Sequence, residues 1–326
     1  MTVRYILKRM GVLVVTLFVI SALAFVAFQI IPGDPVTKLL GTQATPERVA
    51  AMRAELGLDK PATVRFFKWL SAFVKGDFGQ SYGYGISVND LIGDKIITTA
   101  TLTVMSFAFV VIISLPLGMI LARYSEASGK GLLISLQRAF SAVATILTQV
   151  VMAIPPFFIG IIFTFVFGLV LRLFTPGKFV PYTDGFGAFM SYLIFPSLAI
   201  ALPRSAMAIK MLRGSILSEA KSDYVRSAYS RGGGQWYVLI FHIARNAMIP
   251  VVTFLAMTLS DIAAGSIIIE QVFAIPGMGR LLLLSIANRD YPVVQTIVVI
   301  IASVVVIVNF LADLAYQIID PRVRLN

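Results

Sequence analysis

Residues 96–122 read IITTATLTVMSFAFVVIISLPLGMILA, which is 27 residues without a charged side chain. The hydrocarbon core of a bilayer needs about 20 consecutive apolar residues per helix, so this stretch is long enough to cross it. Barrel strands alternate polar and apolar residues over about 10 positions, and this run does not. The chain is therefore expected to hold six transmembrane helices, because five similar runs lie at 10–33, 139–171, 185–203, 291–312 and, with Asp261 as its one acid, 251–269.

The composition supports an integral membrane protein. Of 326 residues, 58% are apolar and 13% are charged, and the mean hydropathy is +0.89. Soluble domains carry about 45–50% apolar and about 25% charged residues. The first run is too long for the core of a signal peptide and no small-residue cleavage site follows it, so we expect it to be retained. The absence of cysteine excludes disulfides and thiolate metal sites, and the single histidine, His242, excludes multi-histidine metal chemistry.

The distribution of Lys and Arg predicts the orientation of the chain. Fifteen basic residues fall in the N-terminus, 123–138, 204–245 and the C-terminus, whereas the short loops on the other side hold four. Cytoplasmic loops carry the excess of positive charge, so both termini are expected in the cytoplasm. The net charge of +11 is then a signal of topology, and nucleic-acid binding is not needed to explain it.

These patterns divide the chain into four parts. Residues 1–32 hold the N-terminal segment and first helix, and 33–95 form a polar extracytoplasmic insertion. Residues 96–320 form a transmembrane core with a basic cytoplasmic loop at 213–250. Residues 321–326 are a cytoplasmic tail.

Two helices are expected inside the insertion. Thr45 is placed to cap a helix with Pro46 at its first position, running to about Leu56 and stopping at Gly57. A second, amphipathic helix is expected over 62–74. Its apolar face is expected to form a small local core from Phe66, Phe67, Leu70 and Phe73.

The run 139–171 is longer than one crossing requires. Two crossings here would place 204–245 outside and reverse the charge asymmetry, so we expect one crossing that is bent or interrupted at Pro155-Pro156. Broken helices persist in lipid only where the freed backbone groups face protein or a water-filled cavity. The break is either a kink that lines a pathway or a bend against neighbouring helices.

The basic loop predicts a short helix. Ser222 or Asp223 can cap a helix that continues to Arg231, with an acid at its positive end and a base at its negative end. Gly232-Gly233-Gly234 ends it, because glycine accepts the left-handed turn. Such a helix is either a solvated surface or a docking element, with one apolar face expected from Leu217, Ala220, Tyr224 and Ala228.

Enzyme motifs are missing, and three acids stand out instead. No phosphate-binding Gly-x-x-x-x-Gly-Lys-Ser/Thr loop, nucleophile elbow or dinucleotide fingerprint occurs, so a membrane enzyme is disfavoured. Asp261 lies inside the fifth span, where an acid is a functional candidate by default; it either faces a polar pathway or is held by a partner such as Arg204. Glu270 is expected at the water-accessible outer end of that span, and Asp313 near the inner end of the sixth.

Several short motifs, in order along nearly the whole chain, resemble the permease subunits of bacterial ABC importers for dipeptides, oligopeptides and nickel. Each is weak alone, and their shared order makes the resemblance specific. They are Pro32-Gly33-Asp34-Pro35, Leu56-Gly57-Leu58-Asp59-Lys60-Pro61, Gly76-Asp77-Phe78-Gly79-Gln80-Ser81, Asp223-Tyr224-Val225-Arg226-Ser227-Ala228 with His242, Arg245-Asn246 and Pro250, Pro276-Gly277-Met278-Gly279-Arg280, Arg289-Asp290-Tyr291-Pro292, and Asp320-Pro321-Arg322.

The resemblance implies an inner-membrane permease of type I ABC importer architecture that catalyses no reaction itself. It implies a heterodimer with a second homologous permease, two cytoplasmic ATPases that bind ATP and Mg²⁺, and an extracytoplasmic binding protein that delivers a peptide-like solute. No cofactor is expected in this chain.

The resemblance also assigns residues. Residues 223–232 would form the coupling helix, seated in a groove on an ATPase, and His242, Arg245 and Asn246 would brace its return to the membrane. The family usually has an alanine, a basic residue and Gly-Leu near the motif's end; here three glycines follow Ser230-Arg231, which is expected to loosen the turn. The candidate coupling residues are Asp223, Tyr224, Val225, Arg226, Ala228, Gly232, His242, Arg245 and Asn246, and the pathway candidates are Pro155, Pro156, Asp261 and Glu270.

The solute stays open between small peptides and the nickel-chelate, glutathione or oligosaccharide cargo of similar permeases. From another class, the alternative is a self-sufficient ion-coupled carrier that uses Asp261. Such a carrier normally needs several deep ionisable groups and an internal repeat, and the sequence shows one deep acid and no clear repeat.

Overall fold

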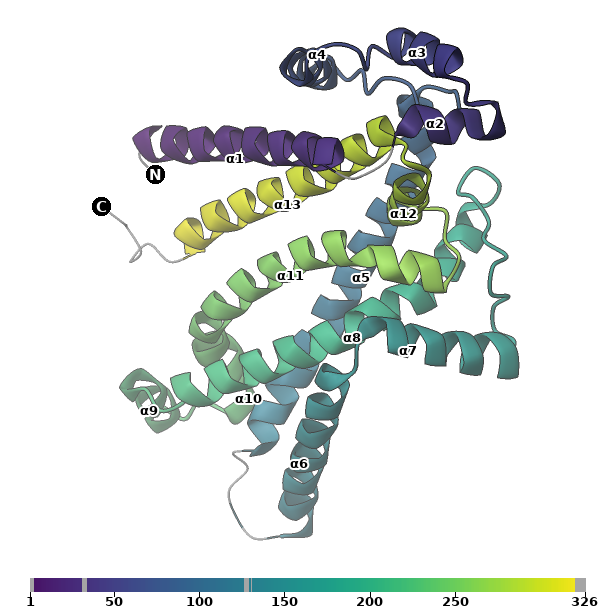
Figure 1. The fold of residues 1–326 in the computed structure, drawn as a ribbon. Helices are drawn as coiled ribbons and strands as arrows, with labels where there is room; N and C mark the ends of the chain where they lie inside the picture. The colour runs from purple at the N-terminus through teal and green to yellow at the C-terminus, as the bar shows by residue number, and fades with distance from the viewer. Residues whose placement is uncertain (1–2, 31–33, 126–128, 130, 320–326) are drawn as a thin grey trace. The chain divides into compact units, whose positions relative to one another are not determined.

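The computed structural model describes residues 3–30, 34–125, 129 and 131–319 (Figure 1). The described residues form helices and no strand, apart from one isolated bridge between Gln80 and Ser87. The elements are α1 (Val3–Ile30), α2 (Pro35–Leu40), the 3₁₀ turn η1 (Gly41–Gln43), α3 (Pro46–Glu55), α4 (Ala62–Val74), α5 (Val88–Ser125), α6 (Leu132–Ala153), α7 (Pro156–Phe163), the π-helical η2 (Thr164–Val170), α8 (Phe186–Glu219), α9 (Asp223–Ser230), α10 (Gln235–Val238), the π-helical η3 (Leu239–Ile243), α11 (Ala244–Val272), α12 (Met278–Asn288) and α13 (Tyr291–Ile319).

Six of these helical segments are long and apolar enough to cross a membrane, which confirms the expected number. They are Leu7–Ala27, Val88–Ser125, Leu132–Ala153, Phe186–Glu219, Gln235–Val272 and Tyr291–Ala312. The sequence placed several ends wrongly, because helices continue through polar residues beyond the apolar run. The clearest case is the fifth segment, expected over 251–269.

The chain divides into two compact units. One contains residues 1–100 and 275–307, and the other contains 101–274 and 308–326. Helices α5 and α13 each contribute residues to both units. The four-part division made from the sequence stays a prediction.

The long apolar run 139–171 is interrupted, as expected, at its two prolines. Helix α6 ends at Ala153, Ile154 and Pro155 are extended, and Pro156 occupies the first turn of α7. The residue before a proline is disfavoured in helical geometry, which explains why Ile154 and Pro155 leave the helix. The crossing segment is therefore α6, which begins at Leu132, and α7 with η2 is a separate, shorter apolar helix.

In the first unit, both helices expected in the insertion are present. The Thr45 hydroxyl oxygen accepts a hydrogen bond from the Arg48 N–H at 3.4 Å, and α3 ends before Gly57, which has a φ of +65°. Helix α4 has the expected bounds. Its aromatic face forms part of the expected local core, since Phe73 packs against Trp69 and Phe78. The core is not confined to the insertion, because Phe66 packs edge-on against Phe18 and Phe25 of α1, and Phe67 is 59% exposed.

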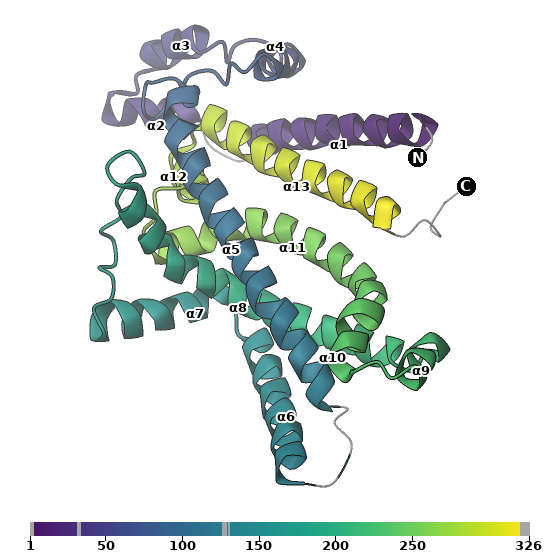
Figure 2. The ribbon, with the colours of Figure 1, turned by 180° about the vertical axis from the view of Figure 1, so that it is seen from behind.

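In the second unit, α8 is the central helix, with α6, α7 and α11 packed against it (Figure 2). Half of its apolar window is buried. Its contact with α5 is close at Gly118, where an added Cβ would lie 2.8 Å from the Cδ2 of Leu212. Helix α8 ends beside α9 and α11 begins beside it, so the packing of α8 against α11 positions the site around α9.

Some predictions lie outside the described residues. Pro32 and Gly33 of the first motif, the Asp320-Pro321-Arg322 motif and the tail 321–326 belong to the segments without a described structure. The side chain of Asp313 is also among those not described.

Candidate functional site

Helix α9 is the short helix expected in the basic loop. It runs Asp223–Ser230, one residue shorter than expected, with Ser222 as the extended residue before it. The Ser222 side chain makes no capping hydrogen bond. Asp223 still favours the helix, because a negative side chain in the first turn interacts well with the positive end of the helix dipole.

The three glycines after α9 form a defined turn. The Gly232 N–H donates to the Tyr229 carbonyl at 2.9 Å and the Gly233 N–H donates to the Ala228 carbonyl at 3.2 Å. These two bonds, with Gly232 at a φ of +84°, make a Schellman motif. A Cβ on Gly233 would lie 2.7 Å from the Val238 side chain and 2.9 Å from the Ala228 carbonyl oxygen. Close packing therefore requires glycine at position 233, and the expected loosening of the turn stays a prediction.

The prediction that four residues around α9 share one apolar helix face is wrong. Leu217 belongs to α8, whereas Ala220 lies in the turn between α8 and α9, so the four residues do not share one helix. Val225 anchors α9 instead and is 1% exposed. Its side chain packs inward and is not presented on the surface of the helix.

A hydrogen-bonded junction joins α9 to the ends of two long helices. The Tyr224 hydroxyl donates to Glu219 Oε1 at 2.7 Å, and the Asn246 amide nitrogen donates to the same carboxylate oxygen and to the Tyr224 hydroxyl, each at 3.1 Å. The Tyr224 hydroxyl also lies 3.4 Å from the His242 carbonyl oxygen. Glu219 is the last residue of α8 and Asn246 lies in the first turn of α11. We call Glu219, Tyr224 and Asn246 the junction.

Sequence reasoning missed Glu219. It has no place in the motifs that carry the family resemblance, and an acid at the end of a helix reads as a solvated residue. Its spacing of five residues before Tyr224 gives no helical signal, because the turn at 220–222 separates the two. Only the fold brings its carboxylate to Tyr224.

The junction changes the protonation behaviour of Tyr224. Burial raises the pKa of Tyr224 above its ordinary value, and the hydrogen bond to Glu219 raises it further, because both disfavour the phenolate; the Asn246 amide acts in the opposite direction. The hydroxyl therefore stays protonated at neutral pH, where it can donate to Glu219.

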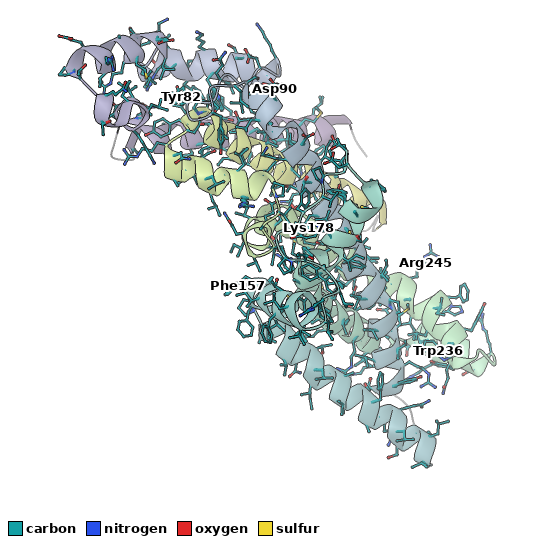
Figure 3. The ribbon with its side chains drawn as sticks, turned by 90° about the vertical axis from the view of Figure 1, so that its right-hand side faces the viewer. Tyr82, Asp90, Phe157, Lys178, Trp236 and Arg245 are labelled. Atoms are coloured by element: carbon teal, nitrogen blue, oxygen red, sulfur yellow. The ribbon has the colours of Figure 1, made fainter. Side chains whose placement is uncertain are left out.

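Other candidate coupling residues present polar groups to solvent. Arg226 is 80% exposed and lies 3.9 Å from the carboxylate of Asp223, which is itself exposed. Exposed ion pairs of this kind contribute little stability, so the Arg226 guanidinium is available to another surface. Arg245 is exposed and projects from its ribbon in Figure 3. His242 takes part through its carbonyl, and its ring packs edge-on against Tyr237.

The pathway candidates have different environments. Asp261 is exposed, and its carbonyl oxygen accepts a hydrogen bond from Arg204 Nη2 at 3.4 Å. Glu270 is fully buried, so its expected position at a water-accessible end is wrong. The reason is that α11 continues to Val272 and packs against α7. The approach is close at Gly160 of α7, since an added Cβ there would lie 3.4 Å from the side chain of Ile269. The break at Pro155-Pro156 begins α7, because the Pro155 carbonyl accepts from the N–H of Phe158 at 3.0 Å.

Two motifs far apart in the sequence meet in the first unit. The buried carboxylate of Asp290 accepts hydrogen bonds from the Ser81 hydroxyl and from the N–H groups of Tyr82 and Gly83, both at 3.0 Å. Ser81, the last residue of the Gly76–Ser81 motif, and the two residues after it are therefore fixed to Asp290, which lies directly before α13. Burial raises the pKa of the Tyr82 phenol, labelled in Figure 3; the nearby Asp290 charge also raises it, while Arg65 opposes this effect.

Among the residues that the structure describes, no group of three or more His, Cys, Asp or Glu side chains could hold a metal ion. Helix α9 is an exposed polar helix whose Tyr224 is hydrogen-bonded to the ends of two membrane-spanning helices.

Comparison with known proteins gives full-length matches. Residues 114–325 match the family model described as "Binding-protein-dependent transport system inner membrane component", and residues 2–103 match the model of its N-terminal region. The chain is 32% identical over 320 residues to a Sinorhizobium fredii protein named "Probable peptide ABC transporter permease protein", covering 98% of this chain and 99% of that one. It is also 32% identical over 320 residues to the "Glutathione transport system permease protein" of Escherichia coli O1:K1, covering 98% of each.

Proposed function

Because the chain belongs to the family of inner membrane components of binding-protein-dependent transport systems, we propose that it forms half of the translocation pathway for small peptides. The family makes it a multi-pass permease subunit of an ABC importer, which works with ATPase and binding-protein partners and is itself not an enzyme. In our proposal the other half is a second homologous permease. Two ATPases hold ATP and Mg²⁺, and the binding protein delivers the solute outside the cell.

The junction is the observation that supports the coupling role of α9. Glu219 ends α8 and Asn246 begins α11, and both bind Tyr224 of α9. A force on α9 therefore reaches two long helices at once, through hydrogen bonds and the buried Val225. Closure of the ATPases would displace α9, and α8 and α11 would transmit the displacement into the membrane.

Within this proposal the candidate residues divide by role. Asp223 and Arg226 are exposed on α9 and would meet the ATPase, whereas Ala228 is half-buried and lies one turn after the buried Val225. Gly232 shapes the end of the helix. Val225 and the junction would transmit force, together with the His242 carbonyl and the neighbouring Arg245.

The orientation follows from the Lys and Arg distribution, which supports cytoplasmic termini and a cytoplasmic α9. A peptide solute is supported by the relative named for peptide transport, and the relative named for glutathione, itself a peptide, agrees with it. A self-sufficient ion-coupled carrier does not agree with membership of a family whose members work with a binding protein.

Two substitutions test the coupling role. Arg226→Glu reverses an exposed charge, and Tyr224→Ala removes the centre of the junction. In the complex reconstituted with both permeases, ATPases and binding protein, we expect membrane insertion to be normal and ATP turnover to continue, while peptide uptake per ATP falls. Arg172→Glu, an exposed arginine in another loop, is the matched control. Wild-type uptake by both α9 variants would contradict the coupling role.

A further inference from the structure

Helices α8 and α11 hold a pair of opposite charges within their membrane-spanning lengths. Arg204 of α8 reaches α11, where its Nη2 donates to the Asp261 carbonyl oxygen at 3.4 Å, while its Nη1 lies 3.4 Å from the Ile200 carbonyl. Gly265 makes room for it, because an added Cβ there would lie 3.2 Å from Nη2. The guanidinium is thus held beside the helix turn that carries the Asp261 carboxyl group.

This charged face does not suit lipid. Asp261 is exposed and Arg204 is half-exposed in the isolated chain, and both lie well inside the segments Phe186–Glu219 and Gln235–Val272. Ionised side chains at such positions almost always face other protein or a water-filled cavity, since contact with hydrocarbon costs several kcal/mol. The face of α8 and α11 that carries this pair therefore lines either a polar pathway or a contact with the partner permease.

The neighbouring side chains are suited to a site that accepts ligands of differing shape. Helices α8 and α11 pack against each other in opposite directions (Figures 1 and 2). One turn from the charges, toward the ends that carry α9, lie Met207 on α8 and Met257 on α11, which are 44% and 58% exposed. Methionine is unbranched and polarisable, and it is common at surfaces that accept many ligands.

We propose that Arg204 and Asp261 form a binding site for the two charged ends of a short peptide in transit. Arg204 would bind the terminal carboxylate, Asp261 would bind the terminal ammonium, and Met207 and Met257 would contact side chains of differing shape. In the empty site the charges of Arg204 and Asp261 balance each other. In the occupied site each of them is balanced by the oppositely charged end of the peptide. This inference rests on the proposed function, because it names the chemical feature by which the pathway would recognise its solute.

Equilibrium binding to the purified complex tests the site apart from transport. The complex of both permeases and ATPases, without binding protein, is titrated with dialanine, N-acetyl-dialanine and dialanine amide, with saturation-transfer NMR as the readout. Wild type should bind dialanine about tenfold more tightly than either capped peptide, since each cap removes one charge-assisted hydrogen bond.

Two substitutions should separate recognition of the peptide's carboxylate from recognition of its ammonium group. Arg204→Gln should lose the preference for the free carboxylate and keep the preference for the free ammonium, whereas Asp261→Asn should do the reverse. Arg204→Lys should restore part of the carboxylate preference, which a role in helix packing alone would not predict. Arg172→Gln and Asp184→Asn, exposed residues of the outer loop, are the matched controls and should bind as wild type does.

The outcomes distinguish the two proposals. If the complete system takes up peptides but its membrane complex shows no preference for free termini, or both variants weaken all three peptides equally, the site is wrong and the proposed function stands. If the complete wild-type system takes up no peptide, the proposed function fails and the site fails with it.

Discussion

Removing one hydroxyl group from the junction should loosen α9. Tyr224→Phe deletes the donor to Glu219 and the acceptor for Asn246 but keeps the ring. A hydrogen bond to a charged group contributes about 1.5–3 kcal/mol, and because Tyr224 is 38% exposed, water can replace part of it. We therefore expect Tyr224→Phe to lower the free energy of opening the junction by about 1.5 kcal/mol. This change corresponds to roughly a tenfold increase in the open population of the junction.

Hydrogen exchange measures this population directly. The amides of Arg231 and Gly233, bonded to the carbonyls of Ser227 and Ala228, should exchange about tenfold faster in the complex that contains Tyr224→Phe. Peptide uptake per ATP should fall in the same preparation. Tyr237→Phe is the matched control, because Tyr237 lies outside the junction, on α10, and its ring is 56% exposed.

A double-mutant cycle with Glu219→Gln locates the effect. Residues in one hydrogen-bonded network show non-additive changes, so the double variant should exchange little faster than Tyr224→Phe alone. Exchange and uptake equal to those of Tyr237→Phe, or additive effects of the two substitutions, would refute the reasoning.

Three further outcomes are expected. Gly233→Ala should lower the thermal midpoint of the complex and impair uptake, since overpacking costs typically about 1–3 kcal/mol. Gly234→Ala, which has no atom within 4 Å of an added Cβ, should leave both unchanged, and equal midpoints for the two variants would contradict the close packing at Gly233. Asp290→Ala should speed proteolysis of 77–87, because buried groups left without a partner cost about 1–3 kcal/mol each, and wild-type cleavage rates would show that other contacts hold this segment. The junction should be intact below pH 10 and open as pH rises through the raised pKa of Tyr224, which tyrosinate absorbance and hydrogen exchange can follow together; exchange that does not change with tyrosinate formation would contradict this.

Much of the architecture could be predicted because lipid imposes simple rules. A charge-free run such as 96–122 has few alternatives to a helix, since unpaired backbone groups are too costly in hydrocarbon. The local signals at Thr45-Pro46 and Gly57 also placed α3 correctly, because caps and glycine stops act within a few residues. The same local reasoning failed where a helix continued past its apolar run, as at Glu270.

The candidate site was predicted in part. The motif around Asp223 located α9, but the sequence could not show that Val225 faces inward or that Gly233 packs against Ala228. Both depend on contacts made after the chain turns back on itself, where hydrophobic periodicity carries no information.

Local patterns in the chain were enough to identify a helical membrane protein with six spans and a basic loop that carries a short helix. Length, apolar runs and capping residues were sufficient, because each acts within one helix or against a uniform solvent. The folded chain was needed to see that Glu219, Tyr224 and Asn246 meet, and that Arg204 lies against the turn of Asp261. The contacts of Asn246 with Tyr224 and Glu219, and of Arg204 with Asp261, join residues 22, 27 and 57 positions apart, and they form only when α8 and α11 pack together.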